Sequence, residues 1–270
     1  MKLRIGFSPC PNDTFIFDAL VNGPLDAEGI EWEVHLEDVQ TLNEWALEGK
    51  LDVTKISFGV WPLLQGDYHL LQSGGALGKG VGPLLIAKSK PGNTSLSALR
   101  DFVRNATIAI PGQHTTAHFL FSRAFPDAPY KQFRVFHEIE NTVVQGEADA
   151  GVIIHENRFT YHQKGLHLLL DLGAFWEEQT GLPIPLGGIV AHKRIGAETA
   201  ARVDRLIRQS LEQALTNYPN LPPFVREHAQ EMEESVMRQH IELYVNDCSL
   251  GMGTEGQQAV EEMLKIFQKG

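Results

Sequence analysis

Hydrophobic and polar positions near the start of the chain follow a strand pattern and then a helix pattern. Apolar residues alternate with small or polar ones at 3–7, and the turn at 9–14 supplies residue types that begin helices. Alternation returns at 32–36, helical spacing follows over 39–47, and 52–57 is typical of a third strand. This order predicts an α/β fold with a parallel sheet and helices on its faces.

The same succession of patterns returns in the middle of the chain. Strands are expected at 107–110, 133–136 and 150–154, with helices from about 115 to 124 and from 141 to 145. The middle of the chain is therefore expected to form a second sheet covered by helices.

Each of the two stretches contains a short segment that resembles a segment in the other. The residues Glu-Gly-Lys-Leu-Asp-Val at 48–53 resemble Gln-Gly-Glu-Ala-Asp-Ala at 145–150. In each, a helix ends at glycine, and a short turn carrying aspartate enters an apolar strand. Two similar lobes are the simplest explanation, although Gly-x-x-Asp turns are common before strands.

Two apolar segments that begin with glycine, 82–87 and 187–192, are expected to carry the chain from one lobe to the other and back. The C-terminal part shows helical apolar stripes that would complete the first lobe. We therefore expect a discontinuous first lobe, residues 1–86 and 190–270, and a second lobe, residues 87–189. This arrangement resembles the type II periplasmic-binding-protein fold, which holds its ligand in a cleft between two lobes.

The composition is that of a globular protein, with 43% hydrophobic and 21% charged residues among 270. A net charge of −11 argues against a nucleic-acid partner, because no basic stripe is available to follow phosphates. The start of the chain lacks the apolar run of a signal peptide, and no segment reaches the ~20 apolar residues of a membrane span. We expect a cytoplasmic protein without a membrane partner, in which Cys10 and Cys248 are reduced thiols.

Ligands of an open parallel sheet bind beyond the carboxyl ends of its strands, where helix N-termini meet. In the first lobe, the third strand ends with Lys55, Ile56 and Ser57. Alternation places the side chains of Lys55 and Ser57 on one face, where they would present an ammonium and a hydroxyl group. From position alone a structural role is the simpler interpretation, and Asn43 on the preceding helix fits a polar surface residue.

Thr115 and Thr116 stand at the start of the helix expected in the second lobe. One of them can cap this helix, which leaves backbone N–H groups pointing outward to an anion such as a carboxylate. An ordinary N-cap without a ligand is the alternative. The stretch from Gly112 to Thr115 lacks the pattern of a nucleotide phosphate loop, so a nucleoside triphosphate is not expected.

His155 follows the apolar run of the last strand expected in the second lobe. It comes six residues after Asp149, as Ser57 comes five after Asp52, so it should emerge at the cleft opposite Ser57. An imidazole with an ordinary pKa near ~6.5 is suited to accept a proton, with Glu156 or a backbone carbonyl fixing its tautomer. A lone histidine is more often structural, and position alone leaves both roles open.

Two other constellations are disfavoured. His114 and His118 have the i, i+4 spacing of zinc ligands, but no HExxH pattern and no third ligand accompany them. Cys10 with His155 would suggest a thiol nucleophile, yet the prolines on either side of Cys10 indicate a residue that fills a turn. We therefore expect no metal.

Four motifs span nearly the whole chain. They are Ser-Pro-Cys-Pro-Asn-Asp-Thr-Phe at 8–15, Lys-Ile-Ser at 55–57, Pro-Gly with Thr-Thr-Ala within 111–117, and Ile-His-Glu at 154–156. In this order they resemble the 1,4-dihydroxy-6-naphthoate synthase family, and the first motif is the most specific. The resemblance implies a lyase of menaquinone biosynthesis by the futalosine route.

Members of this family convert cyclic dehypoxanthinylfutalosine to 1,4-dihydroxy-6-naphthoate and release a three-carbon fragment. The resemblance implies that His155 accepts a proton and that the substrate, a small carboxylate, meets Lys55, Ile56, Ser57, Thr115 and Thr116, a set to which we add Asn43. A retro-aldol-like cleavage with aromatisation needs a base and donors for developing oxyanions, but no redox cofactor.

Three alternatives stay open at this point. Chorismate dehydratase, a related pair of lobes in the same pathway, also takes a cyclic carboxylate. A non-catalytic binding protein for small carboxylates has the same fold, but the missing secretion signal and His155 argue against it. A transcription-regulator sensor domain would need a helix-turn-helix, for which the chain has no room. The sequence does not fix the oligomeric state, and a homodimer is one arrangement that it allows.

Overall fold

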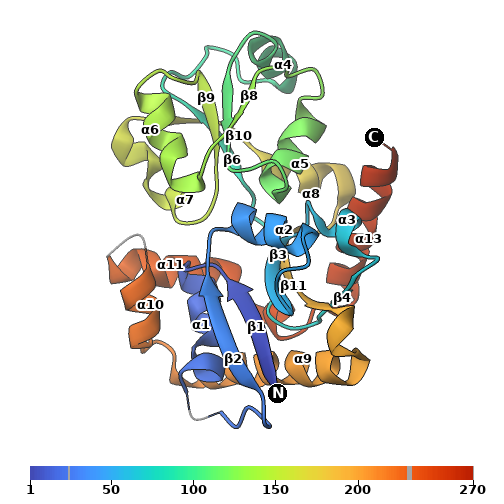
Figure 1. Ribbon diagram of the computed structural model, residues 1–270. Coiled ribbons are helices and arrows are strands. Elements are labelled where there is room, and N and C mark those ends of the chain that lie inside the picture. The colour runs from blue at the N-terminus through green and yellow to red at the C-terminus, as the bar shows by residue number, and fades with distance from the viewer. Residues whose placement is uncertain (24, 230–232, 270) are drawn as a thin grey trace. The chain divides into compact units, whose positions relative to one another are not determined.

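The computed structural model describes residues 1–23, 25–229 and 233–269. The chain divides into two compact units, each built of a sheet and helices (Figure 1). Unit 1 comprises Met1–Gly78 with Pro185–Gly270, and unit 2 comprises Lys79–Ile184. The α/β class predicted from the succession of patterns is confirmed.

The sheet of unit 1 is mixed. Its strands are β1 (Lys2–Phe7), β2 (Glu31–Leu36), β3 (Val53–Ser57), β4 (Tyr68–Leu70), β5 (Ala76–Gly78) and β11 (Ile184–His192). They lie in the order β2-β1-β3-β11-β4, and β5 pairs with β11. As predicted, β1 is parallel to β2 and β3, but β11 runs antiparallel to β3 and β4. The segment at 187–192, expected to carry the chain back to the first lobe, supplies most of β11, and its apolar run alone carries no information on the direction of this strand.

The helices of unit 1 come from both ends of the chain. They are α1 (Pro11–Val21), α2 (Val39–Leu47), α3 (Trp61–Leu64), η3 (Lys193–Ile195), α9 (Ala197–Asn217), α10 (Pro223–His228), α11 (Glu234–Tyr244), α12 (Asp247–Leu250) and α13 (Gly253–Lys269). Helix α1 packs against α9, α10 and α11. N-terminal and C-terminal sequence therefore share one core.

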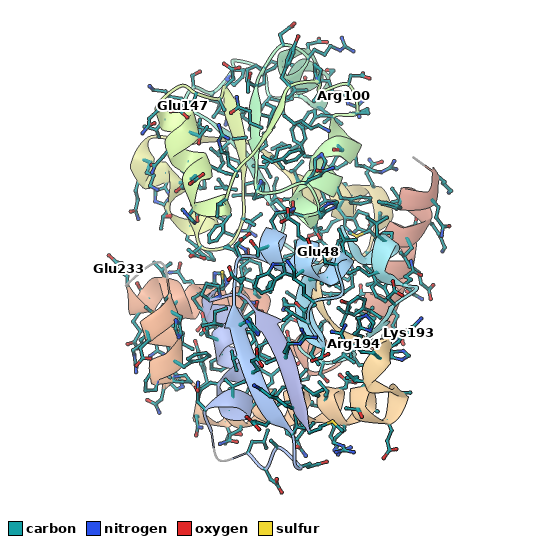
Figure 2. The ribbon with its side chains drawn as sticks, in the orientation of Figure 1. Glu48, Arg100, Glu147, Lys193, Arg194 and Glu233 are labelled. Atoms are coloured by element: carbon teal, nitrogen blue, oxygen red, sulfur yellow. The ribbon has the colours of Figure 1, made fainter. Side chains whose placement is uncertain are left out.

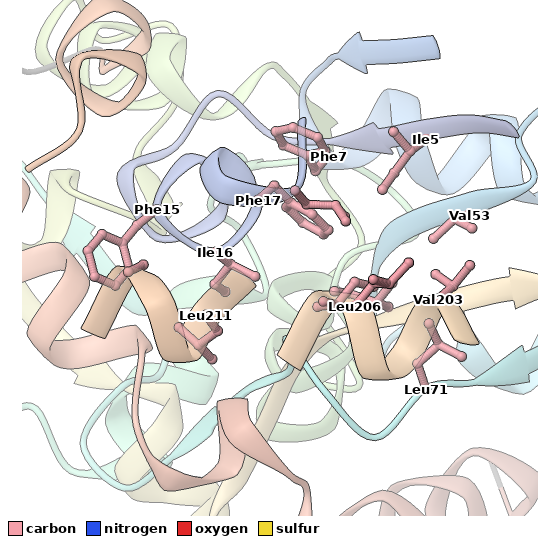
Figure 3. Packing of buried hydrophobic residues seen from close by; sticks show 14 of the residues in the cluster. Ile5, Phe7, Phe15, Ile16, Phe17, Val53, Leu71, Val203, Leu206 and Leu211 are labelled. Carbon is pink, nitrogen blue, oxygen red and sulfur yellow. The ribbon is translucent and has the colours of Figure 1, made fainter. Parts of the chain in front are cut away.

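That core has aromatic residues at its centre. Phe7 on β1 and Phe17 on α1 stack with their ring centroids 4.3 Å apart. Figure 3 shows Val203, Leu206 and Leu211 of α9 in the same cluster. These α9 side chains are fully buried, as their helical spacing predicts.

The sheet of unit 2 has five strands. They are β6 (Leu84–Ala87), β7 (Ile108–Ile110), β8 (Lys131–Phe133), β9 (Ala150–Ile153) and β10 (His167–Asp171), in the order β10-β6-β9-β7-β8. β7 is parallel to β8 and β9, whereas β6 is antiparallel to β9 and β10. The apolar segment at 82–87, expected to link the lobes, thus supplies a strand to unit 2.

The helices of unit 2 are α4 (Leu96–Val103), α5 (Thr116–Ala124), η1 (Phe136–Glu138), α6 (Ile139–Val144), α7 (Asn157–Thr160), η2 (Tyr161–Lys164) and α8 (Leu172–Thr180). The strand expected at 133–136 is wrong, since β8 ends at Phe133 and a helical turn begins at Phe136. Phe133, Arg134 and Val135 are all exposed, so this stretch lacks the alternating burial of a strand.

The six-residue match between 48–53 and 145–150 has a structural basis. Helices α2 and α6 both end just before a glycine in the left-handed region, Gly49 with φ 67° and Gly146 with φ 77°. Side chains make this region costly, so glycine is favoured at both turns.

An aspartate follows each turn and binds the neighbouring strand. Oδ2 of Asp52 accepts the backbone N–H of Arg4 at 2.9 Å, and Oδ2 of Asp149 accepts that of Thr107 at 2.7 Å. Arg4 lies on β1, and Thr107 comes just before β7. In each unit, the aspartate ties the amino ends of two parallel strands together.

Unit 1 reinforces its aspartate with Arg194, which is labelled in Figure 2. Nε of Arg194 lies 2.7 Å from Oδ1 of Asp52. Its two Nη atoms donate to the carbonyls of Gly49 and Leu51. Burial acts to raise the pKa of Asp52, but the contacts with Arg4 and Arg194 outweigh it, so the pKa lies below its ordinary value.

Within the described residues, none of the helices combines the length and the apolar character that crossing a bilayer requires.

Candidate functional site

A buried polar network surrounds Asp13, which follows the carboxyl end of β1. Ser8 donates to Oδ2 of Asp13 through its hydroxyl at 2.7 Å and through its backbone N–H at 3.3 Å. On Oδ1, Nδ2 of Asn12 donates at 2.9 Å, and Nζ of Lys55 also lies 2.9 Å away. The motif at 8–15 thus folds back on itself and fixes one carboxylate.

Lys55 on β3 forms a buried ion pair with this carboxylate. The Lys55 side chain is 6% exposed and that of Asp13 is 3% exposed. Nζ of Lys55 also donates to the carbonyl of Gly74 at 2.9 Å. An ammonium group has three donors, and these contacts use two of them. Since Asp13 balances its charge, Lys55 presents a hydrogen-bond donor rather than a net positive charge.

His240 on α11 joins this network and was missed by sequence reasoning. It is fully buried, and its Nε2 lies 2.8 Å from Oδ1 of Asn12. Because Asn12 turns its amide nitrogen to Asp13, its Oδ1 acts as the acceptor, and Nε2 of His240 carries the proton. The two residues are 228 positions apart, so no local motif could have paired them.

Asn43 on α2 is fully buried, so its interpretation as a surface residue is wrong. Its Oδ1 accepts the N–H of Ser57 at 2.8 Å, and its Nδ2 donates to the Ser57 hydroxyl oxygen at 3.1 Å. Ser57 therefore accepts from Asn43 and directs its own proton elsewhere. Between Lys55 and Ser57, the fully buried Ile56 side chain points to the opposite face of the strand, and the Ile56 backbone pairs with Gly188 of β11.

In unit 2, Thr115 caps α5. Its hydroxyl oxygen accepts the N–H of His118 at 3.1 Å, and its hydroxyl donates to the carbonyl of Gly112 at 2.9 Å. The cap expected at one of the two threonines is therefore Thr115, and its proton is committed to Gly112. Thr116, the first residue of α5, is also buried.

The contacts of His118 speak against the zinc alternative. Its Nδ1 lies 2.7 Å from the carbonyl oxygen of Gln113, and its Nε2 lies 3.4 Å from Nζ of Lys131. Burial lowers the pKa of His118 despite the opposing effect of the Gln113 carbonyl, and burial also lowers the pKa of Lys131. An ammonium group beside Nε2 disfavours a metal ion shared with His114.

His155 lies between β9 and α7 in an unusual backbone conformation. Its φ angle is 56°, in the left-handed region that residues other than glycine seldom occupy. Its half-buried ring meets the ring of Phe136, with centroids 4.8 Å apart and planes at 63°. Backbone strain of this kind concentrates at functional sites. Among the described residues other than glycine, Glu28 shares it, but in an exposed turn, so the strain supports a functional role for His155 on grounds independent of the sequence.

In each unit, the candidate site residues lie at the end of the sheet where the parallel strands finish. β1 and β3 are parallel neighbours, so the Asp13 motif and Ser57 lie at the same end of the unit 1 sheet. β7 and β9 likewise place the Thr115 turn and His155 at one end of the unit 2 sheet. Cys10, considered as a nucleophile, is buried and forms the N-cap position of α1.

Solved structures with this fold include ligand-binding proteins. The aliphatic sulphonate binding protein SsuA of Escherichia coli matches with a TM-score of 0.68 at 12% identity, over 99% of this chain and 92% of that one. At this identity the likeness shows the fold alone, and the chain has the two-lobe periplasmic-binding-protein-like fold. A crystal structure from Archaeoglobus fulgidus matches with a TM-score of 0.90 at 30% identity, over 99% and 97% of the two chains.

The sequence also matches a protein family over nearly its whole length. The profile of a menaquinone biosynthesis family covers residues 3–269, and the chain belongs to this family. A Thermus thermophilus relative is 46% identical, covering 97% of this chain and 92% of the relative. A Streptomyces coelicolor relative is 41% identical, covering 97% and 91%. Both relatives are named 1,4-dihydroxy-6-naphthoate synthase, which confirms the resemblance of the motifs and does not favour chorismate dehydratase.

Proposed function

We propose that this chain is a 1,4-dihydroxy-6-naphthoate synthase, a carbon–carbon lyase that acts on cyclic dehypoxanthinylfutalosine. The observation that carries the proposal is His155 in a left-handed turn at a strand end, in a chain whose curated relatives bear that name. A cytoplasmic location is part of the proposal, because the substrate is an intermediate of a biosynthetic pathway.

His155 is the general base of the proposed reaction. In a retro-aldol cleavage, a base removes a hydroxyl proton, the oxygen's electrons form a carbonyl, and the adjacent carbon–carbon bond breaks. The electron pair of that bond passes to the fragment that becomes aromatic. A positioned imidazole accelerates such a step by about 10²–10⁴-fold. This chemistry calls for no redox cofactor.

The remaining candidates bind the substrate. Ser57 donates its hydroxyl proton, which Asn43 leaves available by acting as a donor to the Ser57 oxygen. The third N–H of Lys55 is a further donor that brings no uncompensated charge. In unit 2, the carboxylate of the substrate is held by Thr116 and the first amides of α5, since the Thr115 proton is committed to Gly112.

The test is turnover by the purified chain. Cyclic dehypoxanthinylfutalosine should yield 1,4-dihydroxy-6-naphthoate, followed by absorbance and by mass. His155→Asn should lower kcat by about 10²–10⁴-fold while substrate affinity is largely retained. The acid limb in the pH profile of kcat/KM should vanish in this variant. His167→Asn, which changes an exposed histidine of the same unit, is the matched control and should keep the parent rate.

Other outcomes separate the alternatives. Binding without turnover would favour a carboxylate-binding protein, and dehydration of chorismate would favour chorismate dehydratase. Parent-like turnover by His155→Asn would remove the base assignment while leaving the substrate in place.

A further inference from the structure

One helical segment of unit 2 contacts the His155 turn at two points. Phe136 packs its ring against the ring of His155, with centroids 4.8 Å apart. Four residues later, Oε2 of Glu140 accepts a hydrogen bond from Nδ2 of Asn157 at 2.8 Å. Since η1 runs directly into α6, residues four apart lie on the same side of this segment. The segment from Phe136 to Glu140 therefore contacts both His155 and Asn157 and holds the two residues in place.

The Glu140 contact is firmly anchored. The Glu140 side chain is 1% exposed, and its Oε2 also lies 2.5 Å from Nζ of Lys164. Both contacts are charge-assisted hydrogen bonds to one oxygen, and such bonds are about twice as strong as neutral ones. Asn157 is likewise buried, so water cannot readily replace its bond to Glu140.

The turn needs such an anchor because its backbone is strained. A non-glycine residue in the left-handed region is disfavoured and persists only where its surroundings impose it. The next residue after Asn157 is held as well, since Nη1 of Arg158 donates to the carbonyl of Gly82 at 3.1 Å. The segment after His155 is thus fixed from two sides, while the ring itself is supported by Phe136.

We propose that Phe136 and Glu140, the latter through Asn157, are positioning residues that hold the His155 imidazole in its catalytic orientation. This inference rests on the proposed function, in which His155 is the base. Neither residue needs to touch the substrate, and their effect on the rate passes through the orientation of the imidazole.

The first test breaks the Glu140 contact. Asn157→Leu removes the donor, keeps the branched shape of the side chain and should lower kcat by about 10- to 100-fold, because a catalytic group displaced by about 1 Å loses rate on that scale. KM should stay within about twofold, since the binding groups are elsewhere. Asn141→Leu is the matched control: it makes the same substitution at an exposed position of α6, leaves the bond between Glu140 and Asn157, and should keep the parent kcat.

A conservative change distinguishes geometry from charge. Oε1 of Glu140 has no hydrogen-bond partner among the described residues, so Glu140→Gln can place its amide nitrogen there and keep an acceptor for Asn157. This variant should retain kcat within about threefold, whereas Glu140→Leu should match Asn157→Leu. Phe136→Leu breaks the second contact and should also lower kcat, which keeps the inference testable if one variant does not fold.

A spectroscopic readout makes the inference independent of turnover. The imidazole resonances of His155, assigned by their loss in His155→Asn, should move in Asn157→Leu and Phe136→Leu but not in Asn141→Leu. Parent-like kcat and unchanged resonances in the first two variants would overturn the inference, even with His155→Asn inactive and the proposed function intact. An active His155→Asn would instead overturn the assignment of His155 as the base, on which this inference rests, and the resonances alone would then decide whether the two contacts orient the ring.

Discussion

The two units build the amino ends of corresponding strands alike and the carboxyl ends differently. At the amino ends, Asp52 binds the N–H of Arg4 and Asp149 binds the N–H of Thr107, each across a pair of parallel strands. The turn before each strand is built in the same way in both units. The residues at the carboxyl ends of the two strands differ.

At the carboxyl ends, unit 1 relies on a hydrogen-bond network and unit 2 on a strained turn. Ser57 ends β3 within the strand and is bonded twice to the buried Asn43. His155 follows β9 with a φ of 56° and is held by neighbours outside its own segment. A buried network should therefore be most sensitive to the loss of a charge or partner, and a strained turn to the loss of its support.

The largest effect is expected from the buried ion pair of unit 1. Lys55→Met leaves the Asp13 carboxylate buried without its cation, and loss of one partner of a buried pair costs about 3–5 kcal/mol. Amide hydrogen exchange of unit 1 should report this loss of stability. Lys50→Met is the control: its pair with Glu48 is at least half exposed, and such pairs contribute about 0–1 kcal/mol. Equal costs for the two variants would contradict a special role for the network.

Much of this architecture could be predicted from the sequence because its signals are local. Alternation at 3–7 and helical spacing over 39–47 recur as β1 and α2, and the glycine turns mark both helix ends. β11 was placed correctly as an apolar segment, but its antiparallel direction depends on pairing with residues more than a hundred positions away.

The site was less predictable because its partners are distant or its residues break local rules. His240 and Asn12 meet across 228 residues, and neither sits in a pattern that demands the other. The interpretation of Asn43 as a surface residue rests on the rule that a polar residue on a helix normally faces water. Here its side-chain amide oxygen instead accepts the backbone N–H of Ser57. The strand-end position identifies His155 as a candidate, but no sequence pattern predicts its left-handed backbone conformation.

A smaller loss is expected when the partner of Ser57 is removed. Asn43→Leu leaves the Ser57 N–H without its acceptor in a buried position, which costs about 1–3 kcal/mol. The Ser57 hydroxyl is then free to rotate, so KM should rise as well. Denaturant unfolding and steady-state kinetics measure the two effects. Glu44→Leu, at an exposed position of the same helix, should change neither stability nor KM. A KM in Asn43→Leu as low as that in Glu44→Leu would speak against a substrate contact of the Ser57 hydroxyl.

The helix cap of unit 2 should matter for stability more than for binding. Thr115→Val removes the side-chain cap of α5 and should cost about 1 kcal/mol. Since the Thr115 proton is committed to Gly112, KM should change less than in Thr116→Val. Thr115→Ser restores the hydroxyl and should recover the stability. A rise in KM for Thr115→Val as large as that for Thr116→Val would assign Thr115 a direct substrate contact.

The smallest effect is a pH dependence from the buried His118 of unit 2. Burial lowers its pKa from the ordinary 6.5, so the unfolded chain takes up a proton at a higher pH than the folded one. Between the two pKa values the unfolded state binds more protons, and stability must fall as the pH falls. The loss should begin near pH 6.5 and be complete below the folded pKa.

Unfolding midpoints of the parent should therefore drop more between pH 7.5 and 5 than those of His118→Gln, which cannot titrate. His167→Gln, at an exposed position of the same unit, should follow the parent, and an identical drop in all three proteins would mean that the pKa of His118 is the same in the folded and the unfolded chain.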